Sequence, residues 1–304
     1  VRLGPPEVVI GGPDATTTVA LTADDGTLVR FSIEVPASRV GSGGGQLWPV
    51  DPGPAPFVPV AVVAALLAGE DLNIAAPITA AQLDGARSAA ALLADWLGRR
   101  PPDITAGAIG EPARPAAAGV GLFFTRGIDS WASLLDHRNR LSHLLFLDGI
   151  EPRLPPEASD RVRADTEAAA TALGLPLISL RVDARERLDP LLSWELTHGA
   201  IMATAALSLS PVLGEVLIAS SHVTGHSGPW GTHADLDPRW STPATRICHD
   251  GGHRSRWDKT VLVAGFQPAL DSLYVCFESG HDRNCGTCRK CLLTMSALEG
   301  VGAL

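Results

Sequence analysis

Four cysteines near the end of the sequence have the spacing of a metal site. They follow the pattern Cys276-x8-Cys285-x2-Cys288-x2-Cys291, and they are four of the five cysteines in the chain. Two successive two-residue gaps fold the backbone into a knuckle that points thiolates inward, and Cys276, at the end of an expected strand, completes a tetrahedron. Four sulfur ligands without an open position predict structural Zn2+, and an iron–sulfur cluster is the alternative.

The fifth cysteine, Cys248, stands apart from this cluster. It is flanked by His249, Asp250 and His253. A free surface thiol and a sulfur-handling nucleophile are both compatible with this position. The sequence favours the surface thiol.

A second set of polar residues interrupts the apolar stretch between Gly119 and Leu135. The run GVGLFF predicts a buried parallel strand, and SWASLL continues at helical spacing. The residues between them, TRGIDS (125–130), form a tight turn before a helix start, a geometry that aims backbone N–H groups at a phosphate. The alternative is an ordinary turn in which Asp129 and Ser130 cap the helix.

The hexapeptide TRGIDS resembles the SGGxDS pyrophosphate loop of the N-type ATP pyrophosphatase (PP-loop) superfamily. Gly127, Asp129 and Ser130 agree with that motif, Thr125 replaces its serine, Arg126 replaces its first glycine, and Ile128 fills its variable position. The arginine closes off φ > 0 and adds bulk where the backbone must approach a ligand. It also adds a cation that can pair with a phosphate or a carboxylate substrate.

The resemblance implies a reaction. Members of the superfamily bind ATP with Mg2+, adenylate a carboxylate or a carbonyl-type oxygen, and release pyrophosphate before a nucleophile attacks. It follows that residues 125–130 bind ATP and that Arg126, Asp129 and Ser130 serve in catalysis. The cysteine spacing is similar to that of the zinc site in 7-cyano-7-deazaguanine synthases of the same superfamily. The resemblance covers about 115–304 of the sequence.

A loop rich in functional side chains is expected between 220 and 259. It holds five of the nine histidines, and within it GTHADLDPRWST (231–242) resembles a loop of PP-loop relatives. His233 and Asp237 suit proton transfer or Mg2+ binding, and Trp230 and Trp240 could stack on a planar ligand. The alternative is a solvent-exposed loop whose tryptophans fill the core. The residues assigned to nucleotide binding outside the hexapeptide are Asp148, Ser220, Arg254 and Lys259, with Arg246 and Arg256 as further cations.

Strands and helices alternate after residue 115. Such alternation predicts an α/β fold with a doubly wound parallel sheet, and ligands bind such sheets beyond the C-terminal ends of the strands. The resemblance implies the adenine nucleotide alpha hydrolase-like (HUP) version of this fold, with five strands. The expected strands are 120–124, 142–147, 175–182, 215–220 and 272–277, and the later helices are 160–173, 194–209 and 292–298. Asp258 is expected to cap a further helix.

The N-terminal part has a different pattern. Residues 1–40 alternate in polarity around Asp25-Gly26, which predicts an antiparallel hairpin. A loop or lid is expected over 41–59, helices over 59–67 and 79–97, and short strands at 72–74 and 103–105. Because 111–119 reads as a linker, we expect a β-rich α+β domain at 1–114 and the PP-loop domain with its zinc knuckle at 115–304.

The composition and net charge limit the classes of partner that the protein is expected to bind. Hydrophobic residues make up 45% of the chain, and the net charge of −9 argues against a large nucleic-acid surface. No apolar run is long enough to span a bilayer, and the first residues lack the features of a signal peptide. We therefore expect a cytoplasmic protein that acts on small molecules. A homodimer is compatible with the sequence.

Three functions fit these observations. The preferred one is an ATP-dependent, AMP-forming ligase or synthase that adenylates a small-molecule carboxylate for attack by an amine, ammonia or a sulfur nucleophile. The second is a degenerate PP-loop protein that acts as a non-catalytic binding or scaffold subunit, for which Arg126 is the main argument. The third is a tRNA-modifying enzyme, which the acidic composition disfavours.

Overall fold

The computed structural model describes most of the 304 residues, namely 1–11, 14–36, 50–111, 115–148, 154–188, 190, 192–225, 228–278 and 282–304. Its strands are β1 (Arg2–Leu3), β2 (Glu7–Gly11), β3 (Asp14–Thr22), β4 (Leu28–Pro36), β5 (Leu72–Ile74), β6 (Ile104–Ala106), β7 (Gly119–Phe123), β8 (His143–Asp148), β9 (Leu177–Val182), β10 (Leu213–Ala219) and β11 (Arg246–Asp250). Its α-helices are α1 (Val58–Ala68), α2 (Ala80–Leu97), α3 (Ile128–His137), α4 (Pro156–Ala172), α5 (Ala184–Leu188), α6 (Trp194–Ser208), α7 (Arg256–Ala264), α8 (Gln267–Ser272) and α9 (Arg289–Gly300). Two short 3-10 helices are η1 (Ala55–Phe57) and η2 (Asp237–Trp240).

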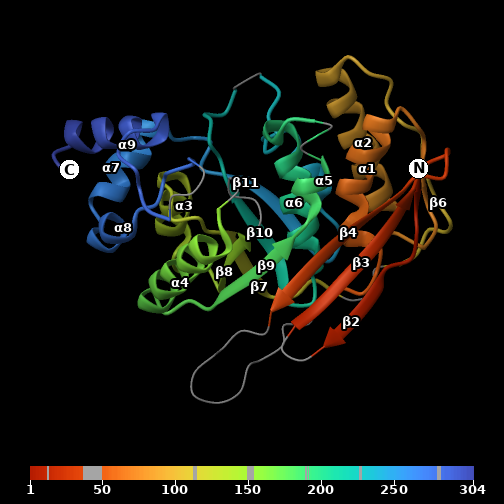
Figure 1. Cartoon of the computed structure of the whole chain (residues 1–304), viewed down its shortest axis with the longest axis horizontal. Coiled ribbons are helices and arrows are strands. Elements are labelled where there is room, and N and C mark those ends of the chain that lie inside the picture. Colours follow the sequence, from red (N-terminus) through yellow and green to blue (C-terminus); the bar gives the residue numbers. More distant parts are fainter. Residues whose placement is uncertain are drawn as a thin grey trace. The chain divides into compact units, whose positions relative to one another are not determined.

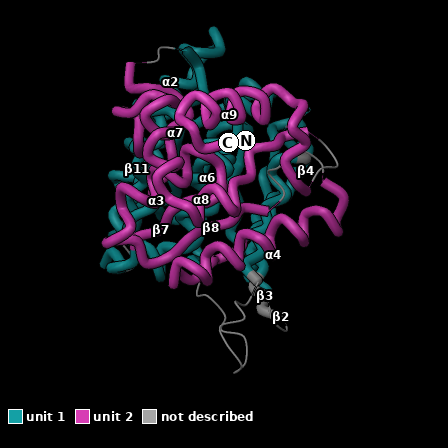
Figure 2. Tube along the Cα trace, turned by 90° about the vertical axis from the view of Figure 1, so that its left-hand side faces the viewer, with its two compact units in different colours: residues 1–119, 180–216, 228–248 teal, residues 120–179, 217–227, 249–304 magenta. Residues whose placement is uncertain are grey.

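The chain divides into two compact units, coloured separately in Figure 2. Unit 1 comprises 1–119, 180–216 and 228–248, and unit 2 comprises 120–179, 217–227 and 249–304. The predicted domain boundary between 114 and 115 adjoins residues 112–114, which lie outside the described residues, and it stays a prediction. Residues 41–49 of the predicted loop or lid and residues 37–40 at the end of the predicted hairpin also lie outside the described residues.

The N-terminal hairpin is confirmed in unit 1. Strands β3 and β4 pair antiparallel, with Val19 opposite Phe31, and Gly26 takes a φ of 85° in the turn between them. Alternate side chains of both strands are buried, because successive residues of a strand point to opposite faces. The expected helices and short strands of this region are present as α1, α2, β5 and β6 (Figure 1).

The sheet of unit 1 extends beyond this hairpin. The order of neighbouring strands is β9-β4-β3-β1-β5-β6, and β2 pairs with β3. Residues Ile33 and Glu34 of β4 pair antiparallel with Val182 and Arg181 of β9, so the N-terminal strands do not form a separate sheet. Parallel pairing of β5 with both β1 and β6 makes the sheet mixed.

The α/β alternation is confirmed in unit 2. The strands β9, β10 and β11 each contribute residues to both units, and the order of neighbours here is β11-β10-β7-β8-β9. Strands β7 and β8 pair in parallel, with Leu122 opposite Leu144, and both side chains are fully buried. This arrangement is an α/β fold with a mixed sheet and is compatible with a Rossmann-like architecture.

The strand predicted at 272–277 is wrong. Helix α8 ends at Ser272, and residues 273–277 form no ladder. The backbone N–H groups of this segment have other acceptors: that of Tyr274 donates to the carbonyl oxygen of Arg126, and those of Val275 and Cys276 donate to Asn284 Oδ1. The strand β11, in the segment predicted to be a loop, lies beside β10 instead.

The structure also bears on membrane insertion. Throughout the described ranges, no helix combines the length and apolar character needed to cross a bilayer.

Candidate functional site

The hexapeptide 125–130 joins β7 to α3. The buried strand ends at Phe123, Gly127 is the N-cap of α3 in extended conformation, and Ser130 donates from its hydroxyl to the Gly127 carbonyl. Helix α3 is ten residues long, so its first-turn amides and its dipole favour negative charge at this end. The predicted order of strand, tight turn and helix is confirmed.

Arg126 has an unusual backbone conformation. Its φ of 61° lies in the left-handed region, and it is the one non-glycine residue with positive φ among the described residues. An L-residue with a side chain pays about 1–2 kcal/mol for this conformation, whereas glycine does not. The prediction that an arginine closes off positive φ at this position is therefore wrong, because Arg126 takes a backbone conformation that glycine adopts more readily.

The Arg126 side chain is enclosed by protein groups. Its guanidinium donates to Thr166 Oγ1 at 3.0 Å, to the Ser272 carbonyl at 3.2 Å and to the Val162 carbonyl at 3.4 Å. Burial lowers the pKa of this guanidinium, and Asp165 and Tyr274 oppose the shift. The residue is 5% exposed, and its Nη1 lies 3.9 Å from Asp165 Oδ2, so groups of the protein itself offset its charge. The pairing of Arg126 with a phosphate or a carboxylate substrate stays a prediction.

Two cations meet the Asp129 carboxylate in the first turn of α3. Arg256 Nη2 lies 2.9 Å from Oδ2, and Lys259 Nζ lies 3.1 Å from Oδ1. Both cations come from the first turns of α7, where Ser255 and Asp258 form a capping box that fixes the helix start. The N-cap is Ser255, and the predicted capping role of Asp258 is confirmed only in part, since Asp258 completes the box from the third helical position. Hydrogen bonds from the Ser255 hydroxyl and N–H lower the pKa of that carboxyl.

Lys259 is unusual for its burial. It is one of two lysines in the sequence, and it is 2% exposed. Its ammonium also donates to the Ser220 carbonyl at 2.5 Å, just beyond the end of β10. A fully buried lysine is rare unless it is paired, because removing an ammonium from water is costly. Lys259 therefore contacts both the helix start that follows β7 and the residue that follows β10.

Polar residues along one face of α3 form a polar stripe, and they contact the segment that carries Arg256 and Lys259. Asp136 accepts two hydrogen bonds from Arg254, at 2.8 and 3.0 Å, and His137 Nε2 lies 2.7 Å from Asp250 Oδ1. Ser133 lies one turn from Asp129 on the same face, and Gly251, with a φ of 76°, passes beside it. We call residues 250–259 the strap.

Two polar atoms at the strap lack a hydrogen-bond partner among the described residues. These are Ser133 Oγ and Asp250 Oδ2, and both are buried. Buried polar atoms are almost always paired in folded proteins, so unpaired ones mark places that merit a functional explanation. Ser133 lies on the same face of α3 as Asp129, and Asp250 is the first residue of the strap that carries Lys259.

The other predicted site residues are placed as follows. Asp148 ends β8 and accepts a hydrogen bond from the Ser159 hydroxyl at 2.6 Å. His233 and Asp237 belong to unit 1, where the backbone N–H of His233 donates to Asp237 Oδ1 and helps to close a turn before η2. Thr125 is exposed, and Ile128 is buried in the core of unit 2. The functional assignments of these residues stay predictions.

Sequence reasoning gave no role to the stripe of α3. Ser133, Asp136 and His137 follow Asp129 at helical spacing, and this pattern was the available signal, because positions three and four apart share a helix face. Their partners Asp250 and Arg254 lie more than a hundred residues later. Spacing alone could not pair them.

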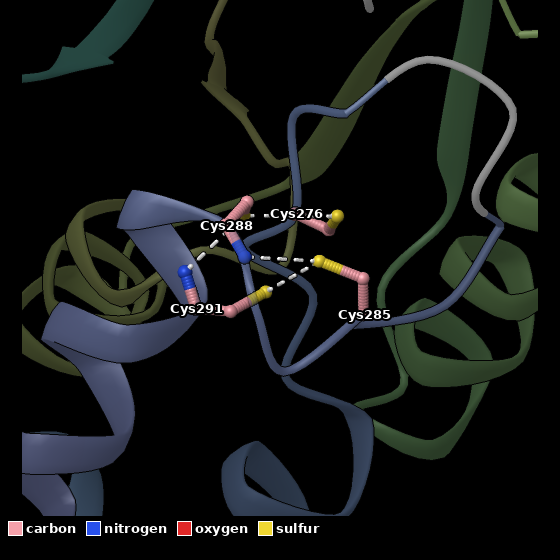
Figure 3. Close-up of side chains that lie close together, drawn as sticks. All are labelled: Cys276, Cys285, Cys288 and Cys291. Carbon is pink, nitrogen blue, oxygen red and sulfur yellow. Dashed lines mark hydrogen bonds between the residues drawn. The ribbon is translucent and has the colours of Figure 1, made fainter.

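The four cysteines come together as predicted. One ligand atom from each lies within 4.8 Å of the others, and the sulfurs of Cys276 and Cys288 are 4.0 Å apart and those of Cys285 and Cys291 are 3.9 Å apart (Figure 3). Zn–S bonds of about 2.3 Å in a tetrahedron place sulfurs about 3.8 Å apart. The donor set and its spacing therefore fit a tetrahedral metal ion such as structural Zn2+.

The surroundings of the cysteines favour the thiolate form of Cys285 and disfavour that of Cys291. Hydrogen bonds from the Thr287 hydroxyl and N–H and from the Cys288 N–H lower the pKa of the Cys285 thiol to about 5. Burial raises the pKa of the Cys291 thiol to about 12, so this sulfur needs a cation to ionise at neutral pH. A bound divalent metal supplies that charge.

Comparison of the sequence with protein-family models and with curated proteins gives no match. The resemblance to the PP-loop superfamily therefore rests on the motifs described above.

Proposed function

We propose that the protein is an ATP-dependent, AMP-forming ligase or synthase of the PP-loop type, with its ATP-binding loop at 125–130. The observation that carries this proposal is the placement of Lys259 and Arg256 at Asp129, in the first turn of the helix that follows β7. A helix N-terminus with two converging cations suits a pyrophosphate group. The edge of the sheet at the ends of β7 and β10 is where α/β folds bind ligands.

In this proposal each residue has a distinct task. The amides at the start of α3 and the cations of α7 neutralise charge that develops on the pyrophosphate leaving group, which is electrostatic rather than covalent catalysis. Asp129 holds both cations in place before the nucleotide binds, because it pairs with each of them. Bound Mg2+ would screen the phosphate charges, and Asp129, the carboxylate within the loop itself, would hold it.

The proposed substrates are ATP and a small-molecule carboxylate or carbonyl-type oxygen, and the nucleophile is an amine, ammonia or a sulfur compound. The metal at the cysteines would be structural, because four thiolates leave no open position for a substrate. The finer assignment of unit 2 to the HUP architecture belongs to this proposal as well. Specialised biosynthesis in the cytoplasm is the setting that we infer.

The direct test is exchange of labelled pyrophosphate into ATP in the presence of a panel of carboxylic acids. We expect at least one acid to support exchange, because adenylation is reversible until the nucleophile arrives. Asp129→Asn should lower the exchange rate by about a hundredfold, since loss of positioned transition-state charge costs about 2.7–4 kcal/mol. Asp160→Asn on the exposed face of α4 is the matched control, and it should leave the rate unchanged.

The outcomes separate the alternatives. ATP binding without exchange for any acid would favour a non-catalytic binding subunit. Equal exchange rates in wild type and Asp129→Asn would contradict the assigned loop.

A further inference from the structure

The buried guanidinium of Arg126 makes contacts that lead away from the ATP-binding loop. Its three hydrogen-bond acceptors lie on α4 and at the end of α8, and its guanidinium carbon lies 5.2 Å from the centre of the Tyr274 ring. The backbone is joined as well, because the Tyr274 N–H donates to the Arg126 carbonyl at 3.1 Å. Arg126 therefore connects the loop to Tyr274 through both its main chain and its side chain.

The segment that contains Tyr274 leads directly to the cysteine cluster. Cys276 follows two residues later, and Asn284 fixes the segment by accepting from the N–H groups of Val275 and Cys276 and donating to the Leu273 carbonyl. Asn284 precedes Cys285 in the sequence. One amide side chain thus ties the first cysteine to the knuckle that holds the other three.

Side-chain packing gives a second connection. Tyr274, Val162, Cys276, Cys288 and Cys291 belong to one buried cluster. The Val162 carbonyl accepts one of the Arg126 hydrogen bonds, and Thr166, one turn later on α4, accepts another. Val162, which accepts a hydrogen bond from Arg126, therefore packs in the same buried cluster as three of the cysteines.

We propose that Arg126 is a positioning residue that couples the four-cysteine site to the loop at 125–130. When the cysteines hold a metal ion, Tyr274 and Val162 are fixed, and they in turn hold Arg126 in its left-handed conformation. That conformation sets the direction of the loop amides for an anionic ligand. The ligand part of this inference rests on the proposed function, whereas the coupling between cysteines and loop does not.

The coupling is reciprocal, because a metal ion that favours one loop conformation must itself be bound more tightly when a ligand selects that conformation. The expected size is about tenfold, within the 5- to 150-fold range typical of coupled sites. Arg126→Gly should remove the coupling while keeping the loop backbone, since glycine takes a φ near 61° without strain.

The test measures amide hydrogen exchange of residues 125–131 with and without zinc in the full chain. In wild type, zinc removal should speed exchange in this segment about tenfold. It should leave the peptide of β10, Leu213–Ala219, unchanged, because no residue of β10, all of which the structure describes, belongs to the cluster that contains the cysteines. In Arg126→Gly the change should be less than about threefold. Thr166→Val, which keeps the side-chain shape but removes one acceptor, should give an intermediate response.

A matched control is available on α4. Arg163 is exposed and pairs with Asp160 on its own helix, so Arg163→Ala should respond to zinc as wild type does. The proposal is overturned if Arg126→Gly or Thr166→Val responds as wild type does. It is also overturned if exchange in β10 rises as much as in the loop, because that would be general loosening.

Pyrophosphate binding, measured by calorimetry, separates this inference from the proposed function. If zinc raises the affinity for pyrophosphate about tenfold in wild type and less than threefold in Arg126→Gly, both are supported. If pyrophosphate fails to bind while loop exchange still depends on zinc and on Arg126, the coupling stands and the proposed function fails.

Discussion

The cysteine cluster and the cluster around Asp129 differ in how they are built. The cysteines lie between 276 and 291, and short spacings bring their sulfurs together. Asp129 and Lys259 are 130 residues apart, and their contact depends on the positions of α3, α7 and the end of β10. The first is a local structure whose four sulfurs are close enough to hold a metal ion, whereas the second depends on the fold and already contains its cations. We therefore expect that disrupting the cysteine cluster and disrupting the cluster around Asp129 will have different consequences.

The largest effect is expected from breaking the cysteine site. Cys288→Ser should abolish stoichiometric metal binding and lower the melting temperature by about 10 °C, because removal of a structural metal typically costs several kcal/mol and each kcal/mol shifts a domain of this size by about 2–4 °C. Metal analysis and calorimetry check the prediction. Cys248→Ser, outside the cluster, should change neither quantity, and an identical loss in that variant would contradict the assignment.

An intermediate effect is expected from two matched glycines, one in each cluster. Gly251 in the strap and Gly286 in the cysteine knuckle have φ values of 76° and 71°. Alanine at either position should cost about 1–2 kcal/mol of stability through backbone strain. Gly286→Ala should also weaken zinc binding, whereas Gly251→Ala should not. Competition with a chelating dye measures this difference, and equal zinc affinities would remove the distinction between the clusters.

The smallest effect is expected from the ion pair that holds the strap. Arg254→Asp places a carboxylate beside Asp136 and should lower the free energy of unfolding by about 1 kcal/mol, because the pair is partly exposed. Adding Asp136→Arg should restore most of that loss. Urea denaturation of the two single variants and the double variant checks this. Destabilisation that simply adds in the double variant would show that the two residues do not interact.

The sequence predicted the elements of unit 2 where apolar runs were clear. The strands at β7, β8, β9 and β10 and the helix α9 lie where expected, because buried strands and amphipathic helices have distinctive patterns. The segment SLYVCF has the apolar pattern of a strand, yet its N–H groups pair with Arg126 and Asn284. A local apolar pattern does not show whether a backbone N–H group will pair with a neighbouring strand or with a residue that is distant in the sequence.

The candidate site was predictable to different degrees. The cysteine cluster could be recognised from spacing, since its ligands are close in the sequence. The burial of Lys259 and the inward direction of the Arg126 side chain could not, because they depend on packing between α3, α4, α7 and the segment after α8. The sequence predicted that an arginine at 126 closes off positive φ, whereas the structure shows a left-handed backbone at this residue.

The most direct test of the proposed function is a calorimetric titration of the metal-loaded protein with ATP and Mg2+, with AMP as the comparison. We predict binding of ATP and little binding of AMP, because the cations of α7 act on the terminal phosphates. Lys259→Met should weaken ATP binding about tenfold to a hundredfold, in line with the loss of one charge-assisted contact of about 1.5–3 kcal/mol. Arg163→Met on α4, which also removes one cation but lies outside both clusters, is the control and should bind as wild type does. Absence of ATP binding at millimolar concentration, or equal affinities in wild type and Lys259→Met, would contradict the account.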